Sequence, residues 1–153
     1  MKILDILDKR LIVPHLQSQT KEGVLRELVR VLAQTEKQVD EERMMEILLE
    51  RESLGSTGIG DGVAIPHGKS RDVQRLLASF GRSLSGMDFQ SMDGKPTHLF
   101  FLLVAPENSA GVHLKALARI SRLMKEMGFR RRLMEAKSTD EIYALFSEGD
   151  EKY

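Results

Sequence analysis

The residue of this chain best suited to chemistry is His67. It follows a short apolar run at 63–65 and Pro66, which lacks a backbone donor and is expected to end a buried strand, so that the imidazole lies at the strand's rim. Gly68 comes next and has no side chain to prevent the close approach of a phosphate or a second macromolecule. An imidazole in this position can act as a nucleophile towards phosphorus or as a metal ligand.

His113 is the second candidate. It lies in the first turn of a predicted helix at 110–127, where free amides and the helix dipole favour an anion. His67 and His113 each follow a predicted buried strand, so parallel neighbouring strands would bring both to one sheet edge, where α/β domains bind ligands. The other histidines have simpler explanations: we expect His15 in a turn or at the surface, and His98 to satisfy a local hydrogen bond.

Three residues between the second predicted helix and His67 could assist in binding an anion. Arg51 ends that helix, and its guanidinium could reach a phosphoryl group; the alternative is a solvent-exposed cation that only favours the helix dipole. Ser56 and Thr57 could donate hydroxyl hydrogen bonds to the same anion, or could merely satisfy the turn.

A metal site is the competing use for the two histidines, with Asp61 or Asp93 as a third ligand. No HxH or HExxH spacing supports it, so we rank it lower and expect neither a metal nor another cofactor. Nucleotide binding is disfavoured as well. Both the phosphate-binding loop suggested by residues 68–70 and the dinucleotide fingerprint suggested by glycines 58 and 60 require a glycine at 63, which is Val63.

Composition excludes several classes of protein. Lys plus Arg and Asp plus Glu number 23 each, so no net basic field attracts nucleic acid or an anionic membrane. The absence of cysteine excludes disulfides and thiolate chemistry. The chain begins without a signal sequence and contains no apolar run near the ~20 residues of a membrane helix. We therefore expect a cytoplasmic protein without membrane insertion.

Apolar periodicity and turn residues predict an α/β fold. The predicted helices are at 21–33 and 41–51, capped by Thr20 and Asp40, and at 110–127 (stopped by Gly128), 129–136 and 139–146. The predicted strands are at 63–65, 75–84 and 98–105, preceded by an extended segment at 11–13. A glycine loop at 55–62, a connection at 86–97 and a fraying tail at 149–153 complete the prediction. This order predicts one domain over 1–153, with a core at about 5–147 and a small mixed sheet covered by helices on both faces.

The segments RESLGSTGIGDGVAIPHGK at 51–69 and FFLLVAPENSAGVHLKALARISRLM at 100–124 resemble the enzyme IIA domain of the bacterial sugar phosphotransferase system, of the fructose and mannitol type. Within that family the chain is most similar to the stand-alone nitrogen-regulatory branch. The resemblance extends through nearly the whole chain and implies a mixed sheet flanked by helices.

The resemblance also implies roles for residues. His67 would accept a phosphoryl group from a phosphorylated HPr-like carrier protein and pass it to a IIB-type or regulatory target, while His113 and Arg51 would stabilise that group. No IIB or IIC domain is attached, which favours a regulatory output. Two alternatives stay open: an interaction module switched by phosphorylation of His67, and a metal-dependent hydrolase. A shallow, partly apolar surface around His67 would suit a transient protein partner.

Overall fold

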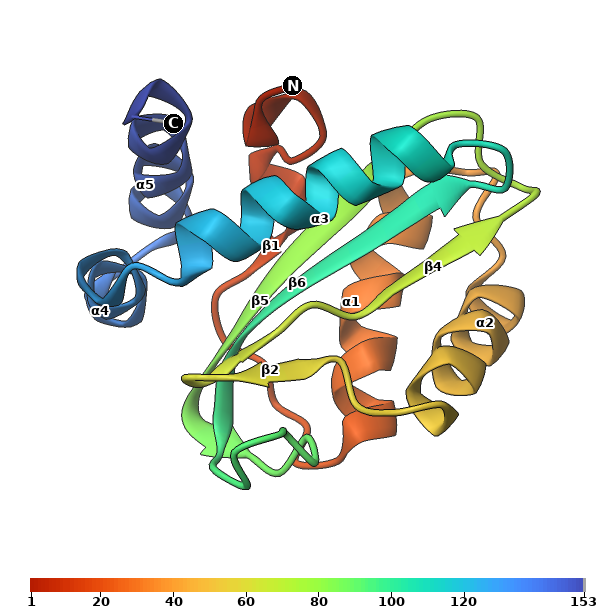
Figure 1. Cartoon of the computed structure of the whole chain (residues 1–153). Helices are drawn as coiled ribbons and strands as arrows, with labels where there is room; N and C mark the ends of the chain where they lie inside the picture. Colours follow the sequence, from red (N-terminus) through yellow and green to blue (C-terminus); the bar gives the residue numbers. More distant parts are fainter. Residues whose placement is uncertain (153) are drawn as a thin grey trace.

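The computed structural model describes residues 1–152, which form a mixed sheet with helices on both faces (Figure 1). The predicted α/β fold is confirmed. The helices are α1 (Lys21–Thr35), α2 (Glu41–Ser53), α3 (Ala110–Met124), α4 (Met127–Glu135) and α5 (Thr139–Lys152); the strands are β1 (Ile12–Val13), β2 (Gly58–Gly60), β3 (Val63–Ala64), β4 (His67–Ser70), β5 (Leu77–Met87) and β6 (Thr97–Pro106). Two 3₁₀ turns, Ile3–Asp5 and Lys9–Leu11, precede β1.

Strand β6 is the centre of the sheet, whose order is β1-β5-β6-β3-β2 with β4 also beside β6. It pairs antiparallel with β5 and parallel with β3 and β4. Residues 100–105 are 0 % exposed, which confirms the prediction of a strand buried on both faces.

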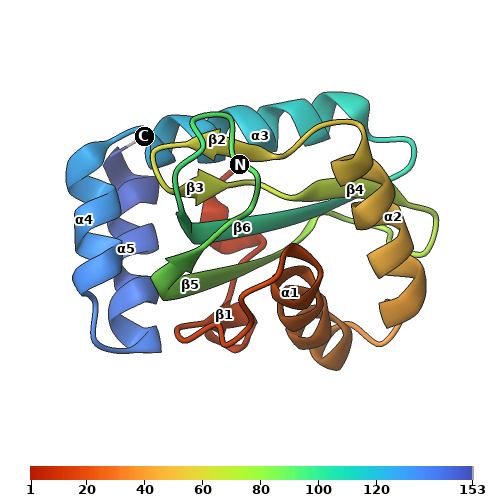
Figure 2. The same ribbon diagram turned by 90° about the horizontal axis from the view of Figure 1, so that it is seen from below.

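Helices α1 and α2 lie on one face of the sheet, and α3 crosses the other (Figures 1 and 2). Alternating residues of β5 show the two layers. Ser79 donates its hydroxyl hydrogen to the carbonyl of Leu28 in α1, whereas the ring of Phe80 packs edge-on against Phe146 of α5, with 5.0 Å between centroids. The predicted caps of α1 and α2 are confirmed, because Thr20 accepts from the amide of Gly23 and Asp40 from that of Glu42.

Two predicted helix ends are wrong. Helix α3 ends at Met124 rather than at 127, and Gly128 lies inside α4 instead of stopping α3. The physical reason is a capping contact: Arg130 donates from Nη1 to the carbonyls of Met124 and Lys125, both at 2.8 Å.

The tail does not fray at residues 149–152, because α5 continues through Lys152 rather than ending at 146. Asp150 is only 6 % exposed and accepts from the amides of Ile3 and Leu4 at 2.7 and 2.9 Å, and from Arg119 at 3.2 Å. These bonds attach the end of α5 to the N-terminal turn. The final residue of the predicted tail, Tyr153, lies outside the described residues.

The glycine-rich segment 55–62 is not only a loop. It contains β2, which forms an antiparallel pair with β3 around a turn in which Asp61 has a φ of 57°. The predicted connection at 86–97 is also shorter than expected, since β5 continues through Gly86, at φ 78°, to Met87. No helix within residues 1–152 is both long and apolar enough to cross a membrane.

Candidate active site

The chain does not leave the sheet at Pro66, as the sequence analysis expected. Strands β3 and β4 pair with β6 in one continuous register, from Val63 opposite Leu99 to His67 opposite Leu103. Pro66 removes one donor, but its φ is compatible with an extended chain and its carbonyl still accepts from the amide of Leu103 at 2.9 Å. His67 is therefore the first residue of β4, not a residue beyond a strand end.

The alternation of β4 directs its side chains to opposite faces of the sheet. A Cβ on Gly68 would lie 2.7 Å from Cγ2 of Ile47 in α2, so that position faces α2. His67 and Lys69 consequently face the side of α3. There the ring of His67 meets that of His113 in a perpendicular arrangement, with 5.5 Å between centroids.

The predicted meeting of His67 and His113 is thus confirmed, but the route predicted for it is wrong. His67 stands at the start of β4 rather than at its carboxyl end. The two rings meet because α3 begins shortly after β6 and runs back over the sheet (Figure 1), which places His113 of its first turn beside His67.

The His67 ring is held in one orientation by a backbone carbonyl. Nδ1 lies 2.8 Å from the oxygen of Ile65, which can only accept, so Nδ1 carries a proton. Burial is the main effect that lowers the pKa of His67 from 6.5, and the charge of Arg51 lowers it further; the bond to Ile65 and the charge of Glu52 act in the opposite direction. The ring is therefore mainly neutral at pH 7, with a lone pair on Nε2.

The His113 side chain is buried, at 5 % exposed, and neither ring nitrogen has a hydrogen-bond partner among the described residues. Leaving such groups unpaired costs about 1–3 kcal/mol each. Burial lowers the pKa of His113, and the neighbouring His67 and Lys69 lower it further. A neutral ring with an unused N–H donor consequently lies beside the His67 ring.

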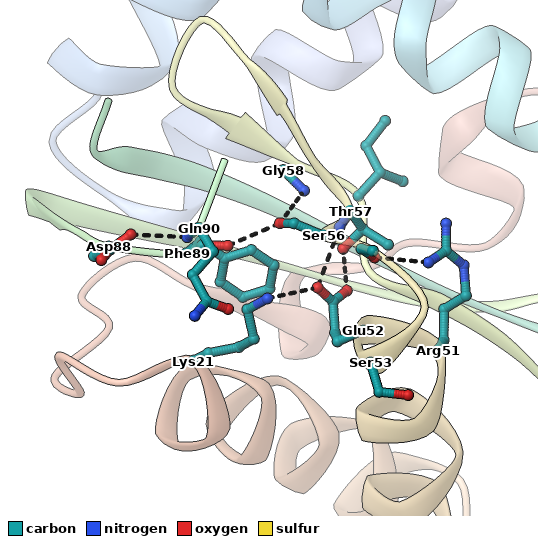
Figure 3. Close-up of polar contacts among 12 residues, drawn as sticks. Lys21, Arg51, Glu52, Ser53, Ser56, Thr57, Gly58, Asp88, Phe89 and Gln90 are labelled. Carbon is teal, nitrogen blue, oxygen red and sulfur yellow. Dashed lines mark hydrogen bonds and ion pairs between the residues drawn. The ribbon is translucent and has the colours of Figure 1, made fainter. Parts of the chain in front are cut away.

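Arg51 lies in the last turn of α2 and donates from Nη1 to the carbonyl of Gly55 at 2.8 Å (Figure 3). After burial, which is the main cause, the charge of Arg51 contributes to lowering the pKa of His67. The structure therefore brings Arg51 to the same site as the two histidines, and the loop that follows α2 fixes the side chain.

The effect of Arg51 on His67 gives a prediction with a definite sign. Because the positive charge of Arg51 disfavours the imidazolium, Arg51→Gln is expected to raise the pKa of His67. A ¹H–¹⁵N titration of the His67 ring measures this directly. Arg51→Lys keeps the charge and is the matched control, for which the pKa should stay close to that of the wild type. An unchanged or lower pKa in Arg51→Gln would show that the guanidinium is too distant to act on the ring.

Ser56 and Thr57 already use their hydroxyl hydrogens. Ser56 donates to the carbonyl of Phe89 at 2.8 Å, and Thr57 donates to the carboxylate of Glu52 (Figure 3). Donation to a bound anion stays a prediction for both residues and would require these bonds to be exchanged.

The absence of a side chain at Gly68 lets α2 pack closely against β4. The sequence analysis instead expected Gly68 to allow the close approach of a phosphate or a second macromolecule. We expect Gly68→Ala to lower the free energy of unfolding by about 1–3 kcal/mol, because its methyl group would overlap Ile47 and press on α2. Urea unfolding measures the change. Gly111→Ala is the control, because a Cβ added at Gly111 would have no atom within 4 Å. Gly94→Ala is unsuitable, because Gly94 has a positive φ. Equal free energies of unfolding for Gly68→Ala and Gly111→Ala would contradict this packing role of Gly68.

Three charged residues of the site were missed by the sequence analysis. Lys69 is an exposed cation on the same face as His67, and the two-residue spacing along a strand would have indicated this. Glu52 is buried after Arg51, and its carboxylate pairs with Lys21 at 3.0 Å. Nothing in the local sequence signals that pair, because Lys21 comes from the start of a different helix.

The remaining candidates lie elsewhere. His15 is exposed, as expected, and His98 satisfies a hydrogen bond from Nδ1 at 3.0 Å, although its partner is the carbonyl of Ser83 on the neighbouring strand β5 rather than a residue close in the sequence. Asp61, in the β2–β3 turn, donates its amide to Asp93 at 3.1 Å. No three His, Asp or Glu side chains within residues 1–152 are placed to hold a metal ion.

Exposed apolar side chains flank the candidate site. Leu54 follows α2 and is 82 % exposed, while Val112 and Leu114, on either side of His113, are 51 % and 66 % exposed. This agrees with the expected partly apolar surface, which suits a transient protein partner.

Comparison with known proteins identifies the family. Residues 5–149 match the model described as phosphoenolpyruvate-dependent sugar phosphotransferase system, EIIA 2. The chain belongs to this EIIA family. EIIA domains are components of a phosphotransferase system, so the membership gives the general kind of activity.

Relatives of this EIIA chain include a nitrogen regulatory protein and a fructose-specific component. It is 40 % identical to the nitrogen regulatory protein of Bradyrhizobium diazoefficiens, covering 96 % of this chain and 95 % of that protein. It is 42 % identical to the fructose-specific EIIABC component of Bacillus subtilis, covering 98 % of this chain but only 24 % of that protein. The chain thus spans about a quarter of the second relative.

Solved structures agree with this assignment. The nitrogen regulatory protein IIA-Ntr of Neisseria meningitidis superposes with a TM-score of 0.86 at 34 % identity, covering 93 % of this chain and 97 % of that one. A chain of the complex of enzyme IIA and phosphorylated enzyme IIB for mannitol from Escherichia coli matches with a TM-score of 0.79, covering 93 % of this chain and 97 % of that one. At 23 % identity this match supports the fold alone. The predicted resemblance to the family is confirmed, and the chain's relatives include both nitrogen regulatory and fructose-specific proteins.

Proposed function

We propose that this EIIA chain is a phosphocarrier in which His67 accepts a phosphoryl group from a histidine-phosphorylated HPr-like protein. One observation carries the proposal: the neutral His67 ring has its Nδ1 proton bound to Ile65, which leaves a lone pair on Nε2, beside a buried His113 whose nitrogens have no partner. This is the arrangement that a nucleophile and an adjacent oxyanion donor require.

The phosphoryl transfer step needs no general base, because no proton has to leave His67 for the new bond to form. The Nε2 lone pair of His67 forms a bond to phosphorus as the phosphorus–nitrogen bond of the donor breaks, and the electron pair of that bond returns to the donor ring. The Nδ1 proton stays on His67, and its bond to the carbonyl of Ile65 stabilises the positive charge that the ring gains. The lowered pKa keeps the ring in the reactive form.

The phosphoryl oxygens would be held by surrounding donors. We assign His113 an N–H contact to one oxygen, with Arg51 and Lys69 supplying positive charge, and leave Ser56, Thr57 and Gly68 as neighbours of the group. In phosphoryl transfer such positioning and charge stabilisation supply most of the rate acceleration. No metal or other cofactor enters the step as we propose it.

The phosphoryl group would then pass to a IIB-type or regulatory target. The near-complete coverage of a nitrogen regulatory protein favours a regulatory output, and we treat residues 1–153 as one EIIA domain with its core at about 5–147. Incubation with a phosphorylated HPr-like donor tests the proposal. We expect one acid-labile, base-stable phosphoryl group per chain; absence of any label would contradict it.

An interaction module without onward transfer is the second candidate, favoured by the exposed Leu54, Val112 and Leu114 around the site. A phosphoryl group on His67 would place a negative charge of about 2 among them and change which partners bind. One assay separates the two functions: a carrier loses its label to an added IIB-type acceptor, whereas a module keeps the label and changes only its binding.

A further inference from the structure

A buried carboxylate lies behind the candidate site and is held on several sides. Glu52 is 8 % exposed, and its carboxylate accepts from Lys21 Nζ at 3.0 Å, from the amide of Thr57 at 3.1 Å and from the Thr57 hydroxyl (Figure 3). Lys21 Nζ in turn lies 4.6 Å from the centroid of the Phe89 ring. The negative charge of Glu52 is thus compensated, and its oxygens are fixed in direction.

The same carboxylate is connected to His67 through the backbone. The carbonyl of Thr57, whose amide and hydroxyl bind Glu52, accepts from the amide of Ile65 at 3.0 Å. The carbonyl of Ile65 accepts from Nδ1 of His67 at 2.8 Å. A continuous series of hydrogen bonds therefore joins Lys21 and Glu52 to the ring through two residues.

The main chain of Glu52 also takes part in the loop that contacts Arg51. The backbone carbonyl of Glu52 accepts from the amide of Gly55 at 3.1 Å, and the carbonyl of Gly55 accepts from the guanidinium of Arg51 at 2.8 Å. Residues 52–57 are consequently held at both ends. Both the nucleophile and its neighbouring cation depend on the conformation of this loop.

We propose that the side chain of Glu52, held by Lys21, is a positioning residue for phosphoryl transfer: through Thr57 and Ile65 it keeps the His67 ring in its Nδ1–H form with Nε2 available. This inference rests on the proposed function. Glu52 acts through other residues and touches none of the reacting atoms.

A purely stabilising role explains the arrangement less well. An ion pair buried to this degree gains little net stability, because desolvation of the two charges offsets their attraction. Its directional bonds, in contrast, fix the position of a carbonyl that selects the tautomer of His67. A misplacement of about 1 Å at a reacting group can reduce a transfer rate by about 100-fold, so such fixing has a direct kinetic effect.

Glu52→Gln tests the proposal, because it keeps the shape of the side chain but removes the charge that pairs with Lys21. We expect the transfer rate at saturating phosphorylated HPr-like donor to fall by about 10- to 100-fold, with the half-saturating donor concentration changed less than about twofold. In ¹H–¹⁵N spectra of the His67 ring, the Nδ1–H form should lose population. The pKa of His67 should fall, since Glu52 now raises it.

Thr57 provides a second, uncharged test that does not depend on how Glu52→Gln folds. Thr57→Val removes the hydroxyl bond to Glu52 but keeps the backbone, so it should slow transfer and shift the tautomer in the same direction as Glu52→Gln. Thr57→Ser restores the hydroxyl and should return both readouts close to wild-type values. Failure of serine to restore them would overturn the assigned connection.

Asp150→Asn is the matched control. Asp150 is also a buried carboxylate that accepts from two backbone amides and pairs with a cation, Arg119, but it joins α5 to the N-terminal turn. This variant should lose stability in thermal unfolding yet leave the rate and the His67 spectrum unchanged.

The outcomes separate this inference from the proposed function. Wild-type kinetics and tautomer in Glu52→Gln, or an equal slowing in Asp150→Asn, would overturn the positioning role. If the wild type accepts no phosphoryl group, the proposed function is wrong, and an unchanged ring spectrum in Glu52→Gln and Thr57→Val would then overturn the positioning of His67 as well.

Discussion

His67→Gln is expected to abolish phosphoryl acceptance, with a loss on the order of 10⁴-fold or more, because the other neutral imidazole at the site, His113, is only 5 % exposed and is closed to a donor protein. His67 is partly buried and makes one side-chain hydrogen bond, so the free energy of unfolding should change by about 1 kcal/mol or less. Transfer from a radiolabelled donor and urea unfolding measure the two effects.

The exposed His15 offers a control for that experiment. His15→Gln removes an imidazole that lies away from the site, and it should accept phosphoryl groups at the wild-type rate. Acid-labile label on the His67 variant, or loss of label on the His15 variant, would show that the phosphoryl acceptor has been assigned to the wrong residue.

His113→Leu is expected to separate function from stability. Both ring nitrogens of His113 are buried without partners, so an apolar side chain of similar size removes a desolvation cost and should leave stability unchanged or raise it by about 1 kcal/mol. Transfer at saturating donor should slow by about 10²- to 10³-fold, the usual effect of losing one oxyanion donor. Rapid-quench kinetics and thermal unfolding test the pair of effects.

His113→Gln serves as the conservative comparison, since it keeps an N–H donor in the same position and should recover part of the lost rate. The opposite pattern would count against the account. If His113→Leu transferred at the wild-type rate but unfolded more easily, His113 would be a packing residue and its unpaired nitrogens would have no role in transfer.

The elements that could be predicted from the sequence are those whose signals are local. The apolar face and the capping Thr20 define α1, and the continuous apolar run at 99–105 defines β6. Ends fixed by tertiary contacts were predicted wrongly. Arg130 ends α3 early, and Asp150 extends α5 by binding amides about 146 residues away in sequence. Pattern alone cannot reveal contacts of that separation.

In the candidate site, too, the residues with local sequence signals could be predicted and those fixed by tertiary contacts could not. His67, His113 and Arg51 stand out because their residue types and neighbouring motifs suggest phosphoryl chemistry. The continuous register across Pro66 could not be foreseen, because proline usually ends a strand and only pairing with β6 shows that the chain continues. The pair formed by Lys21 and Glu52 could not be predicted for a different reason. Charged residues at helix ends are normally solvated, and only the packing of α1 against α2 buries this pair.

The most direct test of the account is to find which atom carries the phosphoryl group. Protein labelled with ¹⁵N-histidine and phosphorylated by an HPr-like donor would be studied by long-range ¹H–¹⁵N correlation of the imidazole rings. We predict a single modified ring, His67, with phosphorus on Nε2 and the proton kept on Nδ1. A phosphoryl group on Nδ1 of His67, or on any other residue, would contradict the claim that Ile65 orients this ring for transfer.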